Sequence, residues 1–191
     1  MVKKTIVYFE KAGPENTSET LKLAKERADE LGIKDIVIAS SHGGTALKAT
    51  EFFDPKENNV VAVTICESFK DLGWTMKPEE REKLESKGIR VLTCIHALGD
   101  NVGSAFTEKH GGITPERVVR ETLYRFCQGM KVAVEIVLMA ADAGLIPVDR
   151  EVIAIAGTDE GADTAIVVQP TYPRKFHELK IKEIIAKLRE P

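Results

Sequence analysis

The sequence has few of the features that mark export, zinc binding or membrane insertion. Its three cysteines are widely separated and form no CxxC pair, so neither a disulfide framework nor a metal site is predicted. The most apolar stretch, residues 132–143, contains Glu135 and Asp142 and is shorter than the ~20 residues that span a bilayer. Residues 1–10 carry only a strand-length apolar run, too short for a signal-peptide core. We therefore expect a cytoplasmic protein with no membrane partner.

A basic surface is also missing. The chain has 27 Lys and Arg against 30 Asp and Glu, and the two signs alternate along it, so no nucleic-acid partner is expected. Glutamine occurs only at Gln128 and Gln169 while 30% of residues are charged, a bias typical of proteins from thermophiles. With 191 residues, 43% of them hydrophobic, the chain is predicted to form one globular domain over residues 1–191.

Strand and helix patterns alternate along the chain. Apolar runs at residues 5–9, 36–39, 60–65 and 90–93 predict strands, and the consecutive apolar residues of the second run predict burial on both faces of a sheet. Helices are predicted between them, one ending at Gly32 and one running from Pro78 to Lys87. This alternation predicts an α/β fold with a mostly parallel sheet.

The C-terminal half is predicted to begin with a long helix. It starts at Thr114-Pro115 and continues to about Ala143, with a kink at Gly129. Residues 152–156 and 164–168 predict two strands that form a hairpin or extend the sheet edge, so one strand is expected to be antiparallel. Residues 179–188 have the spacing of an amphipathic helix.

The most informative loop follows the second predicted strand directly. Two glycines and three hydroxyl residues lead from this strand into a helix, which is the layout of a phosphate-binding turn. The glycines let the backbone approach an anion, and free N–H groups and hydroxyls can donate to it. A capped tight turn is the alternative interpretation. The candidate residues are Ser40, Ser41, His42, Gly43, Gly44 and Thr45.

Other loops after strands supply further candidates, because ligands of such sheets bind beyond the carboxyl ends of the strands. Thr64 ends the third predicted strand, and Gly157, Thr158 and Asp163 belong to the loop that joins the last two, where a simple polar turn is the alternative. Gly103 lies in the long segment 95–113, which we expect to cover the ligand because long loops in compact domains are usually functional.

Several chemically capable residues have simpler explanations. Cys66 and Cys94 are at predicted strand ends near the same edge, where a ligand contact is the alternative, yet free cysteines are usually small buried hydrophobes. Glu135 follows Lys131 by one turn, so an ion pair accounts for it, and a ligand contact is the alternative. His96 and His110 have no cysteine or carboxylate at metal-ligand spacing, so no metal site is expected, and no catalytic residue is assigned. Five aromatic residues at strand ends or in loops could stack on a flat ring of the ligand or belong to the core: Tyr8, Phe9, Phe69, Trp74 and Phe106.

These loops together resemble a known family. The turn 39–46, the segments 129–135 (GMKVAVE) and 139–147 (MAADAGLIP), and residues 156–158 with 161–165 are similar to stand-alone archaeal and bacterial proteins related to the C-terminal α/β domain of pyruvate kinase. The segment 64–69 departs from the Thr-His pattern of these relatives, which puts a ligand role for that loop in doubt. The resemblance implies three α/β/α layers around a five-stranded sheet with one antiparallel strand.

The resemblance also implies a function. In pyruvate kinase the turn similar to residues 40–46 holds a phosphate of an allosteric sugar bisphosphate, and the stand-alone relatives look like FMN-binding proteins. We therefore expect a small phosphorylated ligand, FMN, without kinase activity, because the catalytic barrel of pyruvate kinase needs ~250 residues of its own. A sugar-phosphate or nucleotide sensor and a flavin-dependent oxidoreductase are the alternatives, and exposed sheet edges allow a homodimer.

Overall fold

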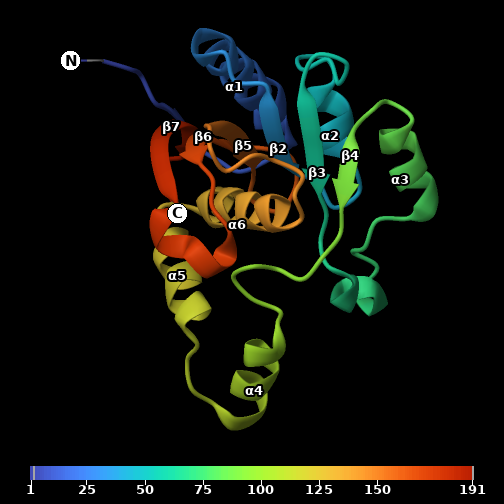
Figure 1. The fold of residues 1–191 in the computed structure, drawn as a ribbon, viewed down its shortest axis with the longest axis vertical. Coiled ribbons are helices and arrows are strands. Elements are labelled where there is room, and N and C mark those ends of the chain that lie inside the picture. Colours follow the sequence, from blue (N-terminus) through green and yellow to red (C-terminus); the bar gives the residue numbers. More distant parts are fainter. Residues whose placement is uncertain (2, 191) are drawn as a thin grey trace.

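A seven-stranded sheet forms the centre of the molecule in the computed structural model, which describes residues 1 and 3–190 (Figure 1). The strand order is β1-β7-β6-β5-β2-β3-β4. The strands are β1 (Val7–Phe9), β2 (Asp35–Ala39), β3 (Asn59–Val63), β4 (Arg90–Leu92), β5 (Val152–Ala156), β6 (Thr164–Gln169) and β7 (Lys180–Leu188). The helices are α1 (Thr17–Leu31), α2 (Gly44–Ala49), α3 (Pro78–Glu85), α4 (Val102–His110), α5 (Pro115–Tyr124) and α6 (Gln128–Asp142), with short 3₁₀ turns at Pro14–Asn16, Glu67–Leu72 and Pro173–Glu178.

The sheet is mixed. Strands β5, β2, β3 and β4 pair in parallel, as do β1 and β7, whereas β6 pairs antiparallel with both β5 and β7. Among the strands formed by the described residues, β6 alone runs against the others, which confirms the predicted single antiparallel strand. The predicted count of five is wrong, because β1 and β7 extend the sheet beyond β6.

Helices cover both faces of the sheet, so the predicted three α/β/α layers are confirmed. Helix α6 packs across β5, β2 and β6 on one face, and α1 and α2 pack on the other (Figure 1). Each interface is a separate apolar core. Side chains alternate between the two: Val37 belongs to the α6 core, whereas its neighbours Ile36 and Ile38 belong to the core beneath α1 and α2. The consecutive apolar residues of β2 are therefore buried on both faces, as predicted.

The predicted C-terminal helix is instead strand β7. Consecutive apolar residues are buried on opposite faces of the sheet here, with Ile184 and Leu188 in the α6 core and Ile185 in the other. The apolar spacing of this segment fits a helix and a doubly buried strand equally well. Pairing decides between them, because the backbone groups of buried β6 need partners, and β7 supplies these from Lys180 to Ala186.

The long helix predicted from Thr114 is also divided. It breaks at Cys127, which has extended backbone (φ 175°) and whose Sγ accepts a hydrogen bond from the Met130 N–H at the start of α6. Gly129 does not produce the break. A Cβ there would lie 2.1 Å from the Thr164 hydroxyl, so this glycine lets α6 pack closely on β6.

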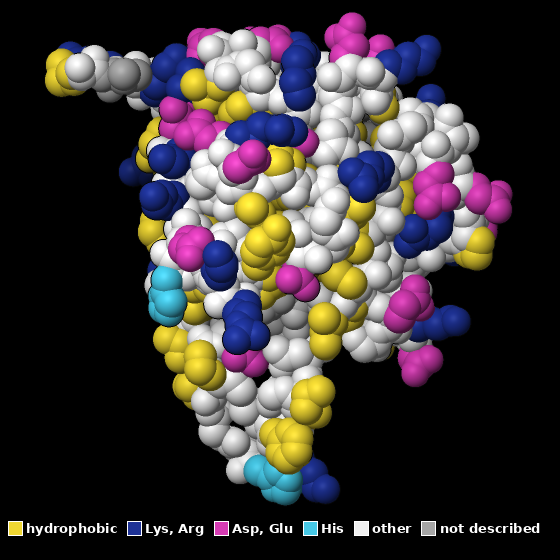
Figure 2. Space-filling model, viewed as in Figure 1, with side chains coloured by type: hydrophobic (Ala, Val, Ile, Leu, Met, Phe, Trp, Pro, Cys, Tyr) yellow, Lys and Arg dark blue, Asp and Glu magenta, His cyan; other side chains and the backbone are white. Residues whose placement is uncertain are grey.

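Helix α4 projects from the body of the protein (Figure 1). In the space-filling view, apolar side chains lie on this projection (Figure 2). Val102, Phe106 and Ile113 of this region are all more than 60% exposed. The segment 95–113 was expected to be a loop that covers the ligand, but most of it extends away from the sheet.

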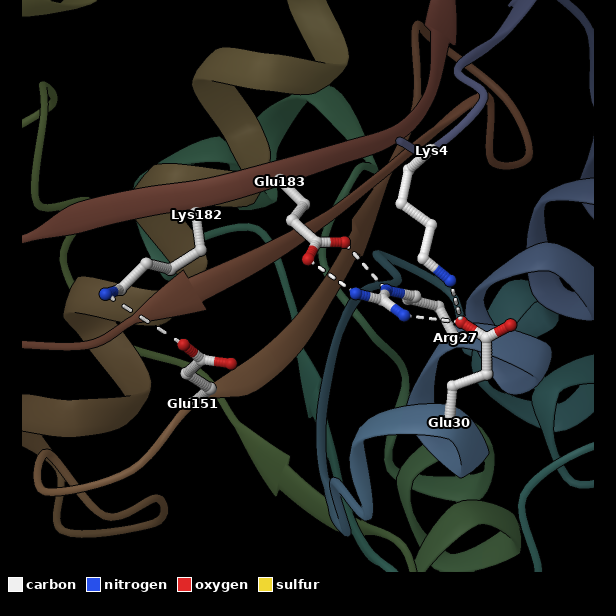
Figure 3. Close-up of polar contacts among 6 residues, drawn as sticks. All are labelled: Lys4, Arg27, Glu30, Glu151, Lys182 and Glu183. Atoms are coloured by element: carbon white, nitrogen blue, oxygen red, sulfur yellow. Dashed lines mark hydrogen bonds and ion pairs between the residues drawn. The ribbon is translucent and has the colours of Figure 1, made fainter. Parts of the chain in front are cut away.

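An ion-pair cluster joins α1 to the terminal strand (Figure 3). The Arg27 guanidinium donates to both carboxylate oxygens of Glu183 at 2.6 and 2.7 Å, and it also contacts Glu30, which accepts from Lys4. The bond from Arg27 lowers the pKa of Glu183. The cluster therefore links β7 to the helix layer.

None of the helices in the described part of the chain combines the length and the apolarity needed to cross a membrane.

Candidate functional site

A cleft of about 510 Å³ lies where β2, β3 and β5 end beside α6. Its volume is within the range of small-molecule sites. The residues that line it come from the loops after these strands, from α6, and from one position in the segment after β4. They are Ala39, Ser40, Ser41, His42, Gly44, Thr45, Val63, Thr64, Ile65, His96, Gln128, Lys131, Val132, Glu135, Ile136, Met139, Gly157, Asp159, Glu160 and Gly161.

The turn after β2 forms one end of the cleft. Gly43 has φ 81°, a conformation that favours glycine, and a Cβ there would lie 3.1 Å from Leu84. The buried Ser40 hydroxyl accepts the N–H of Ala46 at 3.2 Å and thereby holds the turn closed. In the described structure, the N–H groups of Gly44 and Thr45 have no protein acceptor. The turn therefore presents free donors at the cleft.

His42 lies at the outer edge of this turn. Its Nδ1 is 3.1 Å from the Glu80 carboxylate, which also accepts the N–H of Lys77 at the start of α3. The backbone bond from Lys77, with a smaller contribution from His42, lowers the pKa of Glu80. Glu80 therefore stays ionised and holds the His42 ring beside the cleft.

A buried ion pair of α6 forms the opposite wall. Lys131 and Glu135 contact each other, and their side chains are only 9% and 5% exposed. Glu135 also accepts the N–H of Leu98 at 2.9 Å, which attaches the segment after β4 to the helix. The predicted pair is confirmed, and the structure adds that both charged groups line the cleft.

The loop after β5 contributes some of its predicted residues. Gly157 lines the cleft together with Asp159, Glu160 and Gly161, whereas Thr158 and Asp163 do not. Asp163 is 1% exposed, and its two carboxylate oxygens accept the Thr158 N–H at 2.9 Å and the Thr164 hydroxyl at 2.6 Å. Asp163 thus holds the turn from within.

Of the remaining predicted residues, one lines the cleft and the others lie outside it. Thr64 is buried at the cleft wall, and its hydroxyl is 2.6 Å from that of Thr93. Gly103 is in α4 and does not line the cleft. It lies beside Glu116, whose carboxylate would be 2.8 Å from a Cβ at this position. None of the five candidate aromatic residues lines it either; Phe69 stacks on Trp74 and on His96.

The residues of α6 that line the cleft were not among the predicted site residues. Their one signal was a pair of opposite charges in an otherwise apolar helix, for which an ion pair was the preferred interpretation and a ligand contact of Glu135 the alternative. The fold brings this helix face to the ends of β2 and β3, so the pair and three apolar neighbours face the cleft. Those neighbours are Val132, Ile136 and Met139.

Comparison with known protein families agrees with this geometry. The family model described as pyruvate kinase, alpha/beta domain, matches residues 18–168. The matched range contains five strands, β2 to β6, and the turn that ends the cleft, whereas β1 and β7 lie outside it. The five strands that the resemblance implied are therefore present, with two more beside them. The chain belongs to the pyruvate kinase alpha/beta domain family.

Proposed function

We propose that the cleft binds a phosphorylated small molecule, FMN, with its phosphate at the turn Ser40–Thr45. The observation that carries the proposal is the arrangement of this turn: free backbone donors, two glycines and two uncommitted hydroxyls at one end of a 510 Å³ cleft. Ser41 and Thr45 supply those hydroxyls. Backbone amides in such a turn bind phosphate without a lysine.

Beyond the turn, the lining of the cleft suits the ring system and the ribityl chain of FMN. Ile65, Val132, Ile136 and Met139 provide apolar surface, which a flat ring system would cover. Thr64, Gln128 and the carboxylates of the β5 loop provide polar partners for the hydroxyl groups of a ribityl chain. The ring would pack on aliphatic side chains and not on the aromatic residues named from the sequence.

The charge distribution favours one phosphate over two. Glu135, Asp159 and Glu160 all line the cleft, and Lys131, the one lysine among the described residues that line it, is already paired with Glu135. A second phosphate would face these carboxylates without a free cation, and like charges at short range repel. A sugar bisphosphate is therefore a poorer fit than FMN, although membership of the pyruvate kinase alpha/beta domain family keeps a sugar-phosphate sensor as the second candidate.

The proposal is tested first on freshly purified protein. An absorbance scan of the heat-released supernatant, followed by mass spectrometry, should reveal oxidised FMN. Empty protein is then titrated with FMN, riboflavin and a sugar bisphosphate. We expect FMN to bind more tightly than riboflavin, because only FMN can use the turn. Sugar bisphosphate binding without flavin binding would replace the flavin proposal with the sensor.

A further inference from the structure

Three side chains with metal-binding atoms meet at the edge of the cleft. Cys66 Sγ, a ring nitrogen of His96 and a carboxylate oxygen of Asp100 all lie within 4.8 Å of one another. Cys66 follows β3, whereas His96 and Asp100 follow β4, the neighbouring strand. No metal site was expected here, because in the linear sequence Cys66 is far from the other two residues. Parallel pairing of β3 and β4 brings them together.

Hydrogen bonds hold the three groups in place. His96 Nδ1 is 2.6 Å from Asp100, and His96 Nε2 is 3.2 Å from the backbone nitrogen of Cys66. The ring of His96 also stacks on Phe69, and its side chain is only 13% exposed. Asp100 has φ 54°, an uncommon conformation for a residue other than glycine. Two independent chain segments thus fix the histidine and both of its neighbours.

We propose that Cys66, His96 and Asp100 bind a divalent cation of the zinc class. A thiolate, an imidazole and a carboxylate are the three ligand types that Zn²⁺ takes in proteins, at bond lengths of roughly 2.0–2.3 Å. Tetrahedral bonds of this length place ligand atoms roughly 3.5 Å apart. The widest separation in the cluster, at most 4.8 Å, therefore has to shorten by about 1 Å around the ion, whereas His96 Nδ1 and Asp100, now 2.6 Å apart, have to separate if both are ligands.

Metal binding releases one proton and breaks one hydrogen bond of His96. The cation displaces the thiol proton of Cys66 to solvent, and the ring nitrogen that coordinates it gives up its present partner, either Asp100 or the Cys66 N–H. His96 binds as the neutral ring and Asp100 as the carboxylate. The thiolate and the carboxylate together cancel the two positive charges, which suits a site where Cys66 is buried, His96 is half-buried and Asp100 is exposed.

Three protein ligands leave one tetrahedral position for water or for an oxygen atom of another molecule. Because His96 also lines the cleft, the metal site lies next to the proposed ligand site. The inference stands without FMN, since none of the three ligands belongs to the turn Ser40–Thr45.

Cobalt(II) is the probe for the test, because it takes zinc sites and its thiolate complexes absorb in the near ultraviolet. Untagged, chelator-treated protein is titrated with Co²⁺, and difference spectra against the metal-free sample remove any flavin absorbance. We expect one equivalent to give a sulfur-to-cobalt charge-transfer band and visible bands of tetrahedral intensity. Added Zn²⁺ should abolish both.

The variants are chosen to separate this site from other thiols. Cys66→Ser should lose the charge-transfer band, and His96→Gln and Asp100→Asn should each weaken Co²⁺ binding. Cys94→Ser is the matched control, because Cys94 is a neighbouring half-buried thiol outside the cluster whose pKa is raised by burial. It should keep the band.

The proposal is overturned by wild-type spectra without a charge-transfer band. A band that survives in Cys66→Ser and disappears in Cys94→Ser would also overturn it. Circular dichroism of each variant shows whether it is folded. Should Cys66→Ser unfold, Asp100→Asn decides, because unchanged Co²⁺ affinity in that folded variant contradicts the site.

Discussion

Replacement of Gly44 by aspartate should weaken ligand binding without destabilising the fold. Gly44 is the first residue of α2, its φ is not in the left-handed region, and an ideal Cβ there meets no heavy atom within 4 Å. An aspartate side chain therefore fits without a clash. A carboxylate in the first turn of a helix adds about 0.3–1 kcal/mol of stability. The fold should be as stable as before, or slightly more so.

The same carboxylate would face the phosphate. Two unit charges about 4 Å apart repel by about 1 kcal/mol in water and by about 4 kcal/mol near a protein surface. A phosphate monoester carries about two charges, so even the water value gives roughly 2 kcal/mol. Since each 1.4 kcal/mol is tenfold in affinity, Gly44→Asp should weaken FMN binding at least about 30-fold.

Flavin fluorescence titration measures this effect with two controls. Gly44→Asn has nearly the same size without the charge and should bind FMN much more tightly than Gly44→Asp. Riboflavin lacks the phosphate, so its affinity should change little in either variant. Equal FMN affinity of the Asp and Asn variants, with both folded, would refute the placement of the phosphate at this turn.

Three further variants test the structure around the cleft. Glu135→Gln leaves the buried Lys131 unpaired and should cost about 3–5 kcal/mol, whereas adding Lys131→Met should restore much of this stability in chemical denaturation. Glu183→Gln replaces the charged, two-bond pair with Arg27 by at most one hydrogen bond to a neutral amide oxygen and should cost about 1–2 kcal/mol at pH 7. Because the folded pKa of Glu183 is lowered from its ordinary value of 4.5, the pair stabilises fully above that pH, and the difference from wild type should shrink in denaturation at pH 3.5. Gly129→Ala places a methyl group 2.1 Å from a β6 hydroxyl and should destabilise by about 1–3 kcal/mol, lowering Tm; an unchanged Tm would mean that α6 can move away from the sheet.

Much of the sheet could be predicted because its signals are local. Local sequence determines the conformation in the buried apolar runs of β2, β3 and β5 and at the glycine that ends α1. The sequence pattern therefore predicts the observed conformation at these places. The terminal strand could not be predicted in the same way. Its apolar spacing fits a helix as well, and only the unpaired edge of β6 makes it a strand.

In the candidate site, too, some features follow from local sequence and others from tertiary structure. The sequence alone predicted a tight turn at Ser40–Thr45, because glycines and hydroxyls directly after a buried strand favour one, and its role as a phosphate site stays a prediction. Tertiary structure decided the rest: it turned the Lys131–Glu135 pair into a cleft wall and placed Cys66 beside His96. Those positions depend on which strands are neighbours and on which face of α6 meets them. The neighbouring strands and the buried face of α6 are both determined by pairing and packing between distant segments, which a local sequence pattern does not predict.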